Sequence, residues 1–293
     1  MTEAPAQEAA GGEAVLGSLS PSRAGDFKTC PLLYRFRTVD RLPEPPSPDA
    51  VRGTLVHKVL EDLFDLPRGE RTPERAAGMV EAAWEHVLEA EPGAAEMFVG
   101  PEGAGAAGAP ELTRWLASCR DVLARYFTLE DPRRLEPAER ELYVETLLDN
   151  GLQLRGFVDR LDVAPDGAIR VVDYKTGRSP GEAFEAKAMF QMRFYALVIW
   201  RARGVVPAML RLIYLGNGEM VSYQPDERDL LATERLVTAV WQAIRRAHES
   251  GDWRPRRSRL CDWCSFQAYC PEFGGTPPPL PPAPAPPAPP SGG

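Results

Sequence analysis

Two segments of the sequence decide the fold: residues 156–162 read GFVDRLD, and residues 171–177 read VVDYKTG. Both have the apolar, β-branched character of strands, and the short gap between them predicts a hairpin. Side chains two residues apart on a strand share a face, so Asp173 and Lys175 point the same way. Pairing across the hairpin would bring Asp159 beside Asp173. Two carboxylates and a lysine on one sheet surface are suited to binding a divalent cation and activating water.

The segment before this hairpin also alternates and predicts a first strand over residues 141–148. Residues 149–151 read DNG and predict the turn into a second strand over residues 152–163. Residues 165–167 read PDG and predict the next turn, with a third strand over 169–175. We therefore predict a three-stranded meander that carries the Asp-x-Lys sequence at its end.

Most other periodic segments predict helices. Ser20 and Pro21 have the chemistry of an N-cap and a first helical position. Helices are predicted over residues 21–29, 50–66, 73–90, 111–130, 184–203 and 226–249, and two further strands over 210–215 and 220–223. Residues 67–135 would form a helical insertion. The fold class is therefore α/β or α+β, with a central mixed β-sheet flanked by helices.

Both ends of the 293-residue chain have compositions that cannot bury enough apolar surface to become ordered. Residues 1–17 are rich in Ala, Gly and Glu, and residues 274–293 are mostly Pro, Ala and Gly. The folded part is then residues 18–273, which is long enough for one large core or two modest ones. Residues 101–110 form a Gly/Ala-rich connector within it.

The charge and hydropathy of the chain exclude some classes of protein. Its net charge is −8, which argues against a surface that coats DNA through general positive charge but allows a local basic groove. No run approaches the ~20 apolar residues of a membrane span, and no secretion signal opens the chain. We therefore expect a cytoplasmic protein that does not enter a membrane.

A bare Asp-x-Lys tripeptide is common, and its simplest interpretation is an ion pair on a solvated strand. Here Val171, Val172 and Tyr174 surround the tripeptide, which indicates a strand that is covered on both faces. A buried carboxylate and ammonium would be costly without a metal or a substrate to contact. Phosphodiester hydrolysis needs such groups, because a cation held by carboxylates supplies hydroxide and neutralises phosphate charge.

The ordered motifs resemble a known family. GFVDRLD, VDYKTG, Gln191 with Tyr195 on a following helix, and Gly53 with His57 on an upstream helix resemble the RecB-type branch of the PD-(D/E)XK nucleases. The resemblance covers roughly residues 18–273. It implies a restriction-endonuclease-like core and a Mg²⁺- or Mn²⁺-dependent DNA nuclease, expected to be an exonuclease in repair or recombination. Its substrate would be single-stranded DNA or DNA ends.

The resemblance also implies the roles of individual residues. Lys175 would be the catalytic lysine, acting with Asp159 and Asp173. The metal would be held by His57, Asp159, Asp173 and the backbone carbonyl of Tyr174, and the DNA-proximal pair would be Gln191 and Tyr195. Asp162 has the opposite strand parity to Asp159, so we expect it to face away from the metal and to pair with Arg160 or another neighbour.

Three of the five cysteines lie within ten residues, at Cys261, Cys264 and Cys270, which indicates a metal site. A four-coordinate site needs another ligand, for which Cys30, Cys119 and His248 are candidates. Cys119 lies in a helical setting where a small buried residue is expected.

A subset of RecB-like nucleases, including AddB-type subunits and CRISPR-adaptation nucleases, carries one N-terminal cysteine and a C-terminal C-x₂-C-x₅-C. The resemblance implies a [4Fe–4S] cluster bound by Cys30, Cys261, Cys264 and Cys270. The cluster would be a structural staple between the two ends of the nuclease domain. Zn²⁺ bound by the same ligands, or with His248 as the fourth, is the alternative.

Two other functions compete with a nuclease: a catalytically silent nuclease-fold protein that binds DNA, and a zinc-binding interaction protein whose Pro-rich tail recruits partners. The sequence has no phosphate-binding loop, so any ATP-driven unwinding would need a helicase partner in trans. Arginines at 254–259 and 23–41 could form a local phosphate track. Nearby aromatic residues could stack on bases of a single strand, although we expect most of them to lie in the core: Phe27, Tyr34, Phe36, Trp253 and Trp263.

Overall fold

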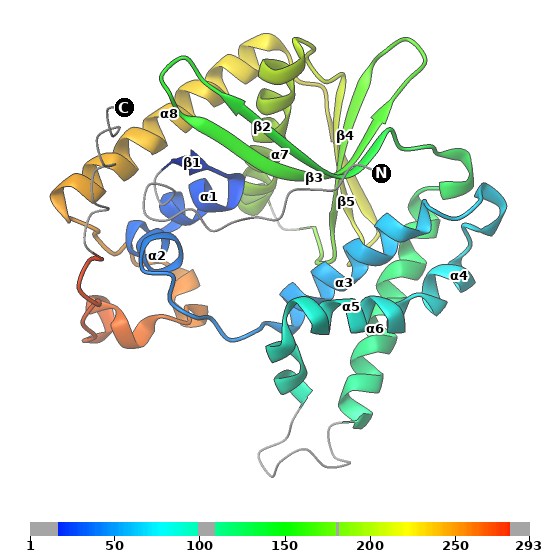
Figure 1. Cartoon of the computed structure of the whole chain (residues 1–293), viewed down its shortest axis with the longest axis horizontal. Helices are drawn as coiled ribbons and strands as arrows, with labels where there is room; N and C mark the ends of the chain where they lie inside the picture. Colours follow the sequence, from blue (N-terminus) through cyan, green and yellow to red (C-terminus); the bar gives the residue numbers. More distant parts are fainter. Residues whose placement is uncertain (1–16, 99–108, 180–181, 282–293) are drawn as a thin grey trace, which may run out of the picture. The chain divides into compact units, whose positions relative to one another are not determined.

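The computed structural model describes residues 17–98, 109–179 and 182–281 (Figure 1). Three segments that the sequence analysis singled out lie wholly or partly outside the described residues. They are the N-terminal segment predicted to be disordered, the connector at residues 101–110 and the end of the Pro-rich tail. Within the tail, the Pro278 carbonyl accepts a hydrogen bond from the Arg35 guanidinium. The chain divides into two compact units. One comprises Met1–Pro43, Thr146–Arg155 and Arg235–Gly293, and the other Glu44–Glu145 and Gly156–Glu234.

The strands form one mixed sheet, as the sequence predicts. The described strands are β1 (Ser18–Leu19), β2 (Glu139–Leu147), β3 (Gln153–Val163), β4 (Ile169–Lys175), β5 (Met209–Tyr214) and β6 (Glu219–Tyr223). Their order is β1-β3-β4-β5-β6, and β2 pairs with β3 outside this path. β4 runs parallel to β5 and antiparallel to β3, while β5 and β6 are antiparallel. The predicted meander β2-β3-β4 is confirmed, and the short strand β1 is an addition.

The turn between β3 and β4 sets the register of the central hairpin. Gly167 has φ of +85°, a conformation that favours glycine, and its N–H donates to the Ala164 carbonyl at 2.8 Å. The ladder then pairs Val163 with Ile169 and ends with Arg160 opposite Val172. The next residues along the two strands are Asp159 and Asp173. The turn chemistry therefore delivers these two carboxylates to the point where the ladder stops.

Helix α7 (Glu182–Arg203) connects the parallel strands β4 and β5 and packs against both. The chain following β4 lies so close to the chain following β5 that a Cβ on Gly216 would be 2.3 Å from the Gly177 carbonyl carbon. Only glycine fits at Gly216, whose N–H donates to the Gly177 oxygen at 3.0 Å. This contact holds the end of the VDYKTG segment in place.

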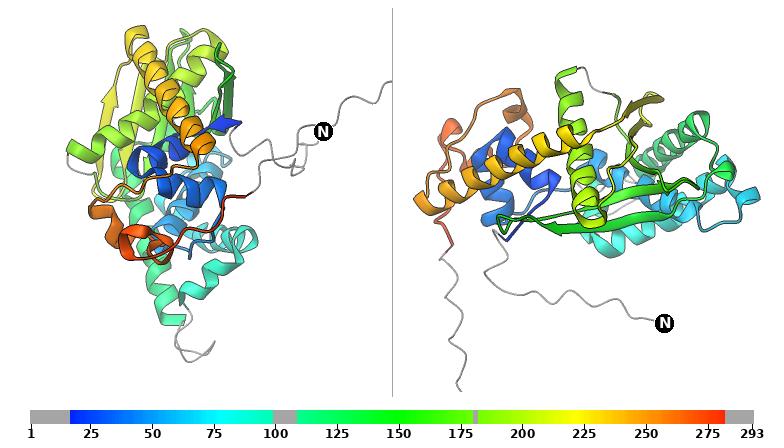
Figure 2. Two further views of the ribbon diagram at one scale, coloured as in Figure 1. Left: turned by 90° about the vertical axis from the view of Figure 1, so that its left-hand side faces the viewer. Right: turned by 90° about the horizontal axis from the view of Figure 1, so that it is seen from above.

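Four helices cover the other face of β4 and β5: α3 (Pro48–Leu63), α4 (Pro73–Gly78), α5 (Val80–Ala90) and α6 (Ala109–Leu129). They group together in Figures 1 and 2 and share one apolar core with Val172, Tyr174 and Ile213 of the sheet. The helix predicted over residues 73–90 is interrupted in the structure: α4 ends at Gly78 and α5 starts at Val80. The segment predicted as an insertion supplies a large part of the core that supports the sheet.

The other unit contains α1 (Pro21–Thr29), α2 (Pro31–Tyr34) and a π-helical turn over Arg35–Val39. Ser20 caps α1 as predicted, accepting from the Arg23 N–H. Of the five aromatic residues considered for stacking, four are buried in this unit, as expected for most of them: Phe27, Tyr34, Phe36 and Trp253. Tyr34 stacks on Trp253 with ring centroids 5.8 Å apart. Trp263 is 78% exposed.

The remaining elements are α8 (Glu227–Ser250) and short 3₁₀ turns at Arg68–Glu70, Pro92–Phe98, Pro132–Arg134, Arg259–Trp263, Gln267–Tyr269 and Pro271–Phe273. The predicted helix boundaries agree with the structure to within a few residues. Among the described helices, none combines the length and the apolar character needed to cross a bilayer.

Candidate metal-dependent active site

The candidate site lies where β3 and β4 separate. Beyond the last ladder pair, Asp159 turns its carboxylate toward the partner strand, and its Oδ2 accepts from the Tyr174 N–H at 2.7 Å. The carboxylate thus replaces a backbone partner that Tyr174 would otherwise lack. Asp173 is almost fully buried on the same sheet face as Lys175. The two carboxylates predicted to meet are therefore adjacent at the end of the ladder.

Helix α3 brings His57 to the same place. The His57 Nε2 lies 2.9 Å from the Tyr174 carbonyl oxygen, and because a carbonyl can only accept, Nε2 carries the proton. The other ring nitrogen, Nδ1, faces Asp159 Oδ2 at 3.6 Å. A backbone carbonyl that fixes the tautomer in this way is the usual arrangement behind a histidine metal ligand. In this geometry the Tyr174 carbonyl contacts His57, whereas the resemblance implies that it contacts the metal.

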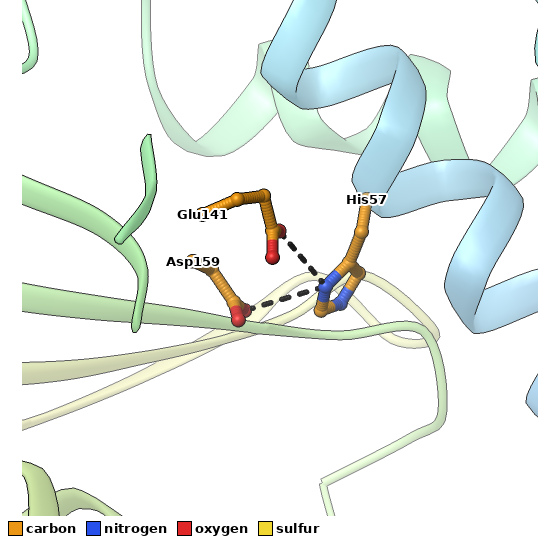
Figure 3. Close-up of side chains that lie close together, drawn as sticks. All are labelled: His57, Glu141 and Asp159. Carbon is orange, nitrogen blue, oxygen red and sulfur yellow. Dashed lines mark ion pairs between the residues drawn. The ribbon is translucent and has the colours of Figure 1, made fainter. Parts of the chain in front are cut away.

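Glu141, which was not among the predicted ligands, completes the candidate metal-binding group. Its Oε1 lies 3.8 Å from His57 Nδ1, and Figure 3 shows the two carboxylates on the same side of the imidazole. Ligand atoms of His57, Glu141 and Asp159 lie within 4.8 Å of one another. Within the described residues, no other three His, Cys, Asp or Glu side chains meet this criterion. Two carboxylates and an imidazole are suitable ligands for a divalent cation.

The backbone at Glu141 is in an unusual conformation, with φ of +42° in a residue other than glycine. Such strain persists only where surrounding contacts enforce it, and it is common at functional sites. The neighbouring Arg140 supplies contacts to α3: its guanidinium donates to the Glu61 carbonyl at 2.5 Å and to Asp65 at 2.6 Å. The start of β2 is thereby fastened to the helix that carries His57.

The sequence held one signal for Glu141. The Leu148 N–H donates to the Leu152 carbonyl across the turn at residues 149–151. Counting back from that pair places Glu141 opposite Asp159 in an antiparallel hairpin. Using the turn to set the register of this hairpin would have suggested Glu141.

A second group of side chains surrounds Asp173. The Lys175 ammonium lies 2.6 Å from Asp173 Oδ2 and donates to Gln191 Oε1 at 3.0 Å. The Gln191 amide donates in turn to Asp173 Oδ1 and to the Tyr195 hydroxyl, each at 3.0 Å. Gln191, predicted to share a helix face with Tyr195, therefore contacts the lysine and a carboxylate, and Tyr195 contacts Gln191. The Asp173 carboxylate is part of this group and also acts electrostatically on Asp159 and His57.

Concentrated negative charge perturbs the titration of the site. Burial and the adjacent Asp173 carboxylate raise the pKa of Asp159 to about 7. Burial opposes a charge on His57, but Asp159, Glu141 and Asp173 outweigh it and raise the pKa of His57 to about 9. These shifts favour a positive charge between the carboxylates. A bound divalent cation would supply that charge and displace the ligand protons.

Asp162 faces away from this site, as expected from its parity. It contacts the Arg160 guanidinium at 3.1 Å and Arg170 at 2.7 Å. The Arg160 side chain is buried on the opposite face of β3 and donates to the Tyr174 hydroxyl at 2.5 Å and to both oxygens of Glu130. Successive side chains of β3 therefore point alternately to the site and to a buried ionic network on the opposite face.

The cysteines predicted as cluster ligands lie together in the unit that contains α1. The Arg256 N–H donates to Cys30 Sγ and the Ser258 N–H donates to Cys261 Sγ, each at 3.3 Å. Burial, together with the nearby thiols of Cys30, Cys264 and Cys261, raises the pKa of Cys270. Cys119 is buried in the α3–α6 core, as predicted. His248 contacts the ring of Trp253, at 6.3 Å between centroids.

A mixed sheet with helices on both faces, and with carboxylates and a lysine where two strands separate, is the architecture of a metal-dependent nuclease. The chain belongs to the PD-(D/E)XK nuclease superfamily, whose family model matches residues 18–271. Members of this superfamily use divalent metal ions, and the His57, Glu141 and Asp159 group could bind one.

Two phage proteins and one solved structure are similar to this chain. The Gene 69 protein of Mycobacterium phage D29 is 27% identical over 281 residues, covering 87% of this chain and 96% of that protein. The Gene 69 protein of Mycobacterium phage L5 is 28% identical over 127 residues, or 42% of this chain and 41% of that protein. The crystal structure of a proposed exonuclease from Eubacterium rectale has a similar fold, with a TM-score of 0.55. It is 15% identical and covers 86% of this chain and 88% of that one.

Proposed function

We propose that this protein is a Mg²⁺- or Mn²⁺-dependent DNA nuclease of the RecB type, which removes nucleotides from DNA ends during repair or recombination. The observation that carries the proposal is the convergence of Asp159, Asp173 and Lys175 on one sheet face, with His57 and Glu141 beside them. A silent nuclease-fold protein would have no need to keep a partly buried lysine and several carboxylates together, because such groups are costly to bury.

The chain's own groups can be assigned to steps of phosphodiester hydrolysis. A bound divalent cation would polarise the phosphate and activate a water. His57, Glu141 and Asp159 would hold that cation beside the buried Asp173 carboxylate. The Lys175 ammonium lies within reach of water or phosphate oxygen beside Asp173 and would stabilise the developing negative charge. Any ATP-driven unwinding of a duplex substrate would come from a separate helicase, because the sequence has no phosphate-binding loop.

The position of Gln191 supports these roles. Its oxygen accepts from Lys175 and its amide nitrogen donates to Asp173, so one side chain fixes the lysine and the carboxylate relative to each other. Tyr195 holds Gln191 from the next turn of α7. We propose that this pair keeps the catalytic geometry preorganised and close to the substrate.

The activity is tested on single-stranded DNA labelled at either the 5′ or the 3′ end, with Mg²⁺ or Mn²⁺. We expect the wild type to release mononucleotides or short products from one end, which gives the polarity, and Asp173→Asn to lose at least 10²-fold in rate. Addition of a chelator should stop the reaction. If wild type and variant were equally inactive on linear single strands, duplex ends and circles, the enzyme assignment would be wrong.

We further propose that Cys30, Cys261, Cys264 and Cys270 bind a [4Fe–4S] cluster. Two of the thiols accept backbone N–H bonds, which commonly support cluster sulfurs. Zn²⁺ bound by the same thiols is the alternative.

This proposal predicts a brown protein after anaerobic purification, with about four iron atoms per chain and broad absorption at about 400 nm. Cys30→Ala should lose most of the iron because it removes a ligand. Cys119→Ala, a thiol buried in the other unit, is the matched control and should keep the iron. A colourless protein that contains zinc and no iron would contradict the cluster.

A further inference from the structure

Two aromatic side chains of the nuclease unit, Tyr143 on β2 and Phe157 on β3, are exposed to solvent. Tyr143 is 44% exposed and Phe157 is 54% exposed. Their rings contact each other with centroids 5.2 Å apart and planes inclined at 56°. Among the described residues of this unit, they are the aromatic side chains with large exposed surfaces.

The pair lies beside the metal-binding group. Phe157 precedes Asp159 by two residues on β3, so the two side chains share a sheet face at a separation of about 7 Å. The ring contact places Tyr143 on that face too, two residues beyond Glu141 on β2. A molecule that reaches the cation between Glu141 and Asp159 would therefore pass over these two rings.

Hairpin stability alone does not account for this arrangement. A cross-strand aromatic pair stabilises a hairpin through the contact between its rings, which does not require about half of each ring to stay open. The Tyr143 hydroxyl donates to the Glu145 carboxylate at 2.8 Å, which fixes the direction of the ring. Glu145 would also repel a phosphate at this position. The surface is therefore suited to an uncharged, flat group.

We propose that Tyr143 and Phe157 form a stacking platform for an unpaired base of the substrate strand, next to the phosphate that is cut. This inference rests on the proposed nuclease function and gives its substrate class as single-stranded DNA. Bases inside a duplex already stack on their neighbours, whereas an unpaired base can place its π-face on an aromatic ring. Because all bases have such a face, the platform would bind without sequence preference.

The test compares Tyr143→Ala, Phe157→Ala and the double variant with Val163→Ala, which removes an exposed apolar side chain from the same face of β3. We expect each alanine replacement to raise KM for single-stranded DNA about tenfold, with kcat nearly unchanged. The Phe157→Trp variant, which keeps an aromatic ring at this position, should have the KM of the wild type. The Val163 variant should match the wild type. Circular dichroism of each variant verifies that the hairpin has folded.

A second measurement locates the base. A series of single-stranded substrates carries one abasic nucleotide at successive positions. The wild type should cut about tenfold less efficiently when the abasic nucleotide lies at the platform, because no base is there to stack. The cleavage efficiency of the double variant should not depend on the position of the abasic nucleotide. If the wild type cleaves DNA but KM and the abasic profile are unchanged in the double variant, the platform is wrong and the nuclease stands. If the wild type cleaves no DNA, the nuclease proposal itself fails.

Discussion

A Lys175→Met variant is expected to lose about 10³-fold in cleavage rate, equivalent to about 4 kcal/mol of transition-state stabilisation. The Lys175 ammonium is held at 2.6 Å from Asp173 and at 3.0 Å from Gln191, so it is fixed before the substrate arrives. Methionine keeps the length and apolar stem of lysine but cannot donate a proton or neutralise developing charge. The loss should therefore appear in kcat more than in KM.

The matched control is Lys58→Met. This side chain is on the helix that carries His57, but its ammonium pairs with Glu61 and Asp62 near the surface. Both variants remove one positive charge from the same unit, so a general electrostatic effect on DNA binding would appear in each. Single-turnover rates and Mn²⁺ binding should be measured for both proteins. A Lys175 variant that cleaves as fast as the Lys58 variant would remove Lys175 from the mechanism.

An Arg160→Met variant is expected to lose about 3–5 kcal/mol of unfolding free energy. The Arg160 side chain is 1% exposed and its main partner, Glu130, is 7% exposed. Without the guanidinium, the Glu130 carboxylate would remain buried with Arg211 at 3.6 Å as its remaining ionic partner. The Tyr174 hydroxyl would also lose the donor that lies 2.5 Å away. Breaking a buried pair from one side leaves an uncompensated charge, which is why the cost is large.

Thermal unfolding of the variant should show a midpoint lower by about 10 °C, at roughly 2–4 °C per kcal/mol for a unit of this size. The double variant Arg160→Met with Glu130→Met should recover most of the loss, because the orphaned carboxylate is gone. Arg133→Met breaks an exposed pair with Asp131 and should leave the midpoint unchanged. Equal midpoints for the single and double variants would show that the buried pair does not set the stability.

This network also connects stability with the site. Arg160 follows Asp159 on β3 and donates to the side-chain hydroxyl of Tyr174. The backbone N–H of Tyr174 contacts Asp159, and its backbone carbonyl contacts His57. Glu130 follows helix α6, so the helical layer reaches the back of the site through a buried ion pair. At temperatures below its unfolding midpoint, where the Arg160→Met variant is folded, it should therefore cleave single-stranded DNA more slowly than the wild type.

Much of the fold was predictable because its signals are local. Alternation identified β2, β3 and β4, and the glycine in the turn at residues 165–167 set the register that brings Asp159 and Asp173 together. Ser20 was recognised as a cap because capping depends on neighbouring backbone groups. The helix interruption near Gly78 was missed, because an apolar stripe continues across it and only packing separates α4 from α5.

The sequence by itself determined the strands, the order of the motifs and which carboxylates and lysine share a face, since these follow from strand period and turn chemistry over a few residues. The turn register can place Glu141 opposite Asp159, but only the tertiary structure decided that both face His57, because this requires a strained backbone that Arg140 fastens to a distant helix. It also decided that Arg160 pairs with Glu130 behind the site. Contacts of this kind depend on how separate elements pack, which no local pattern encodes.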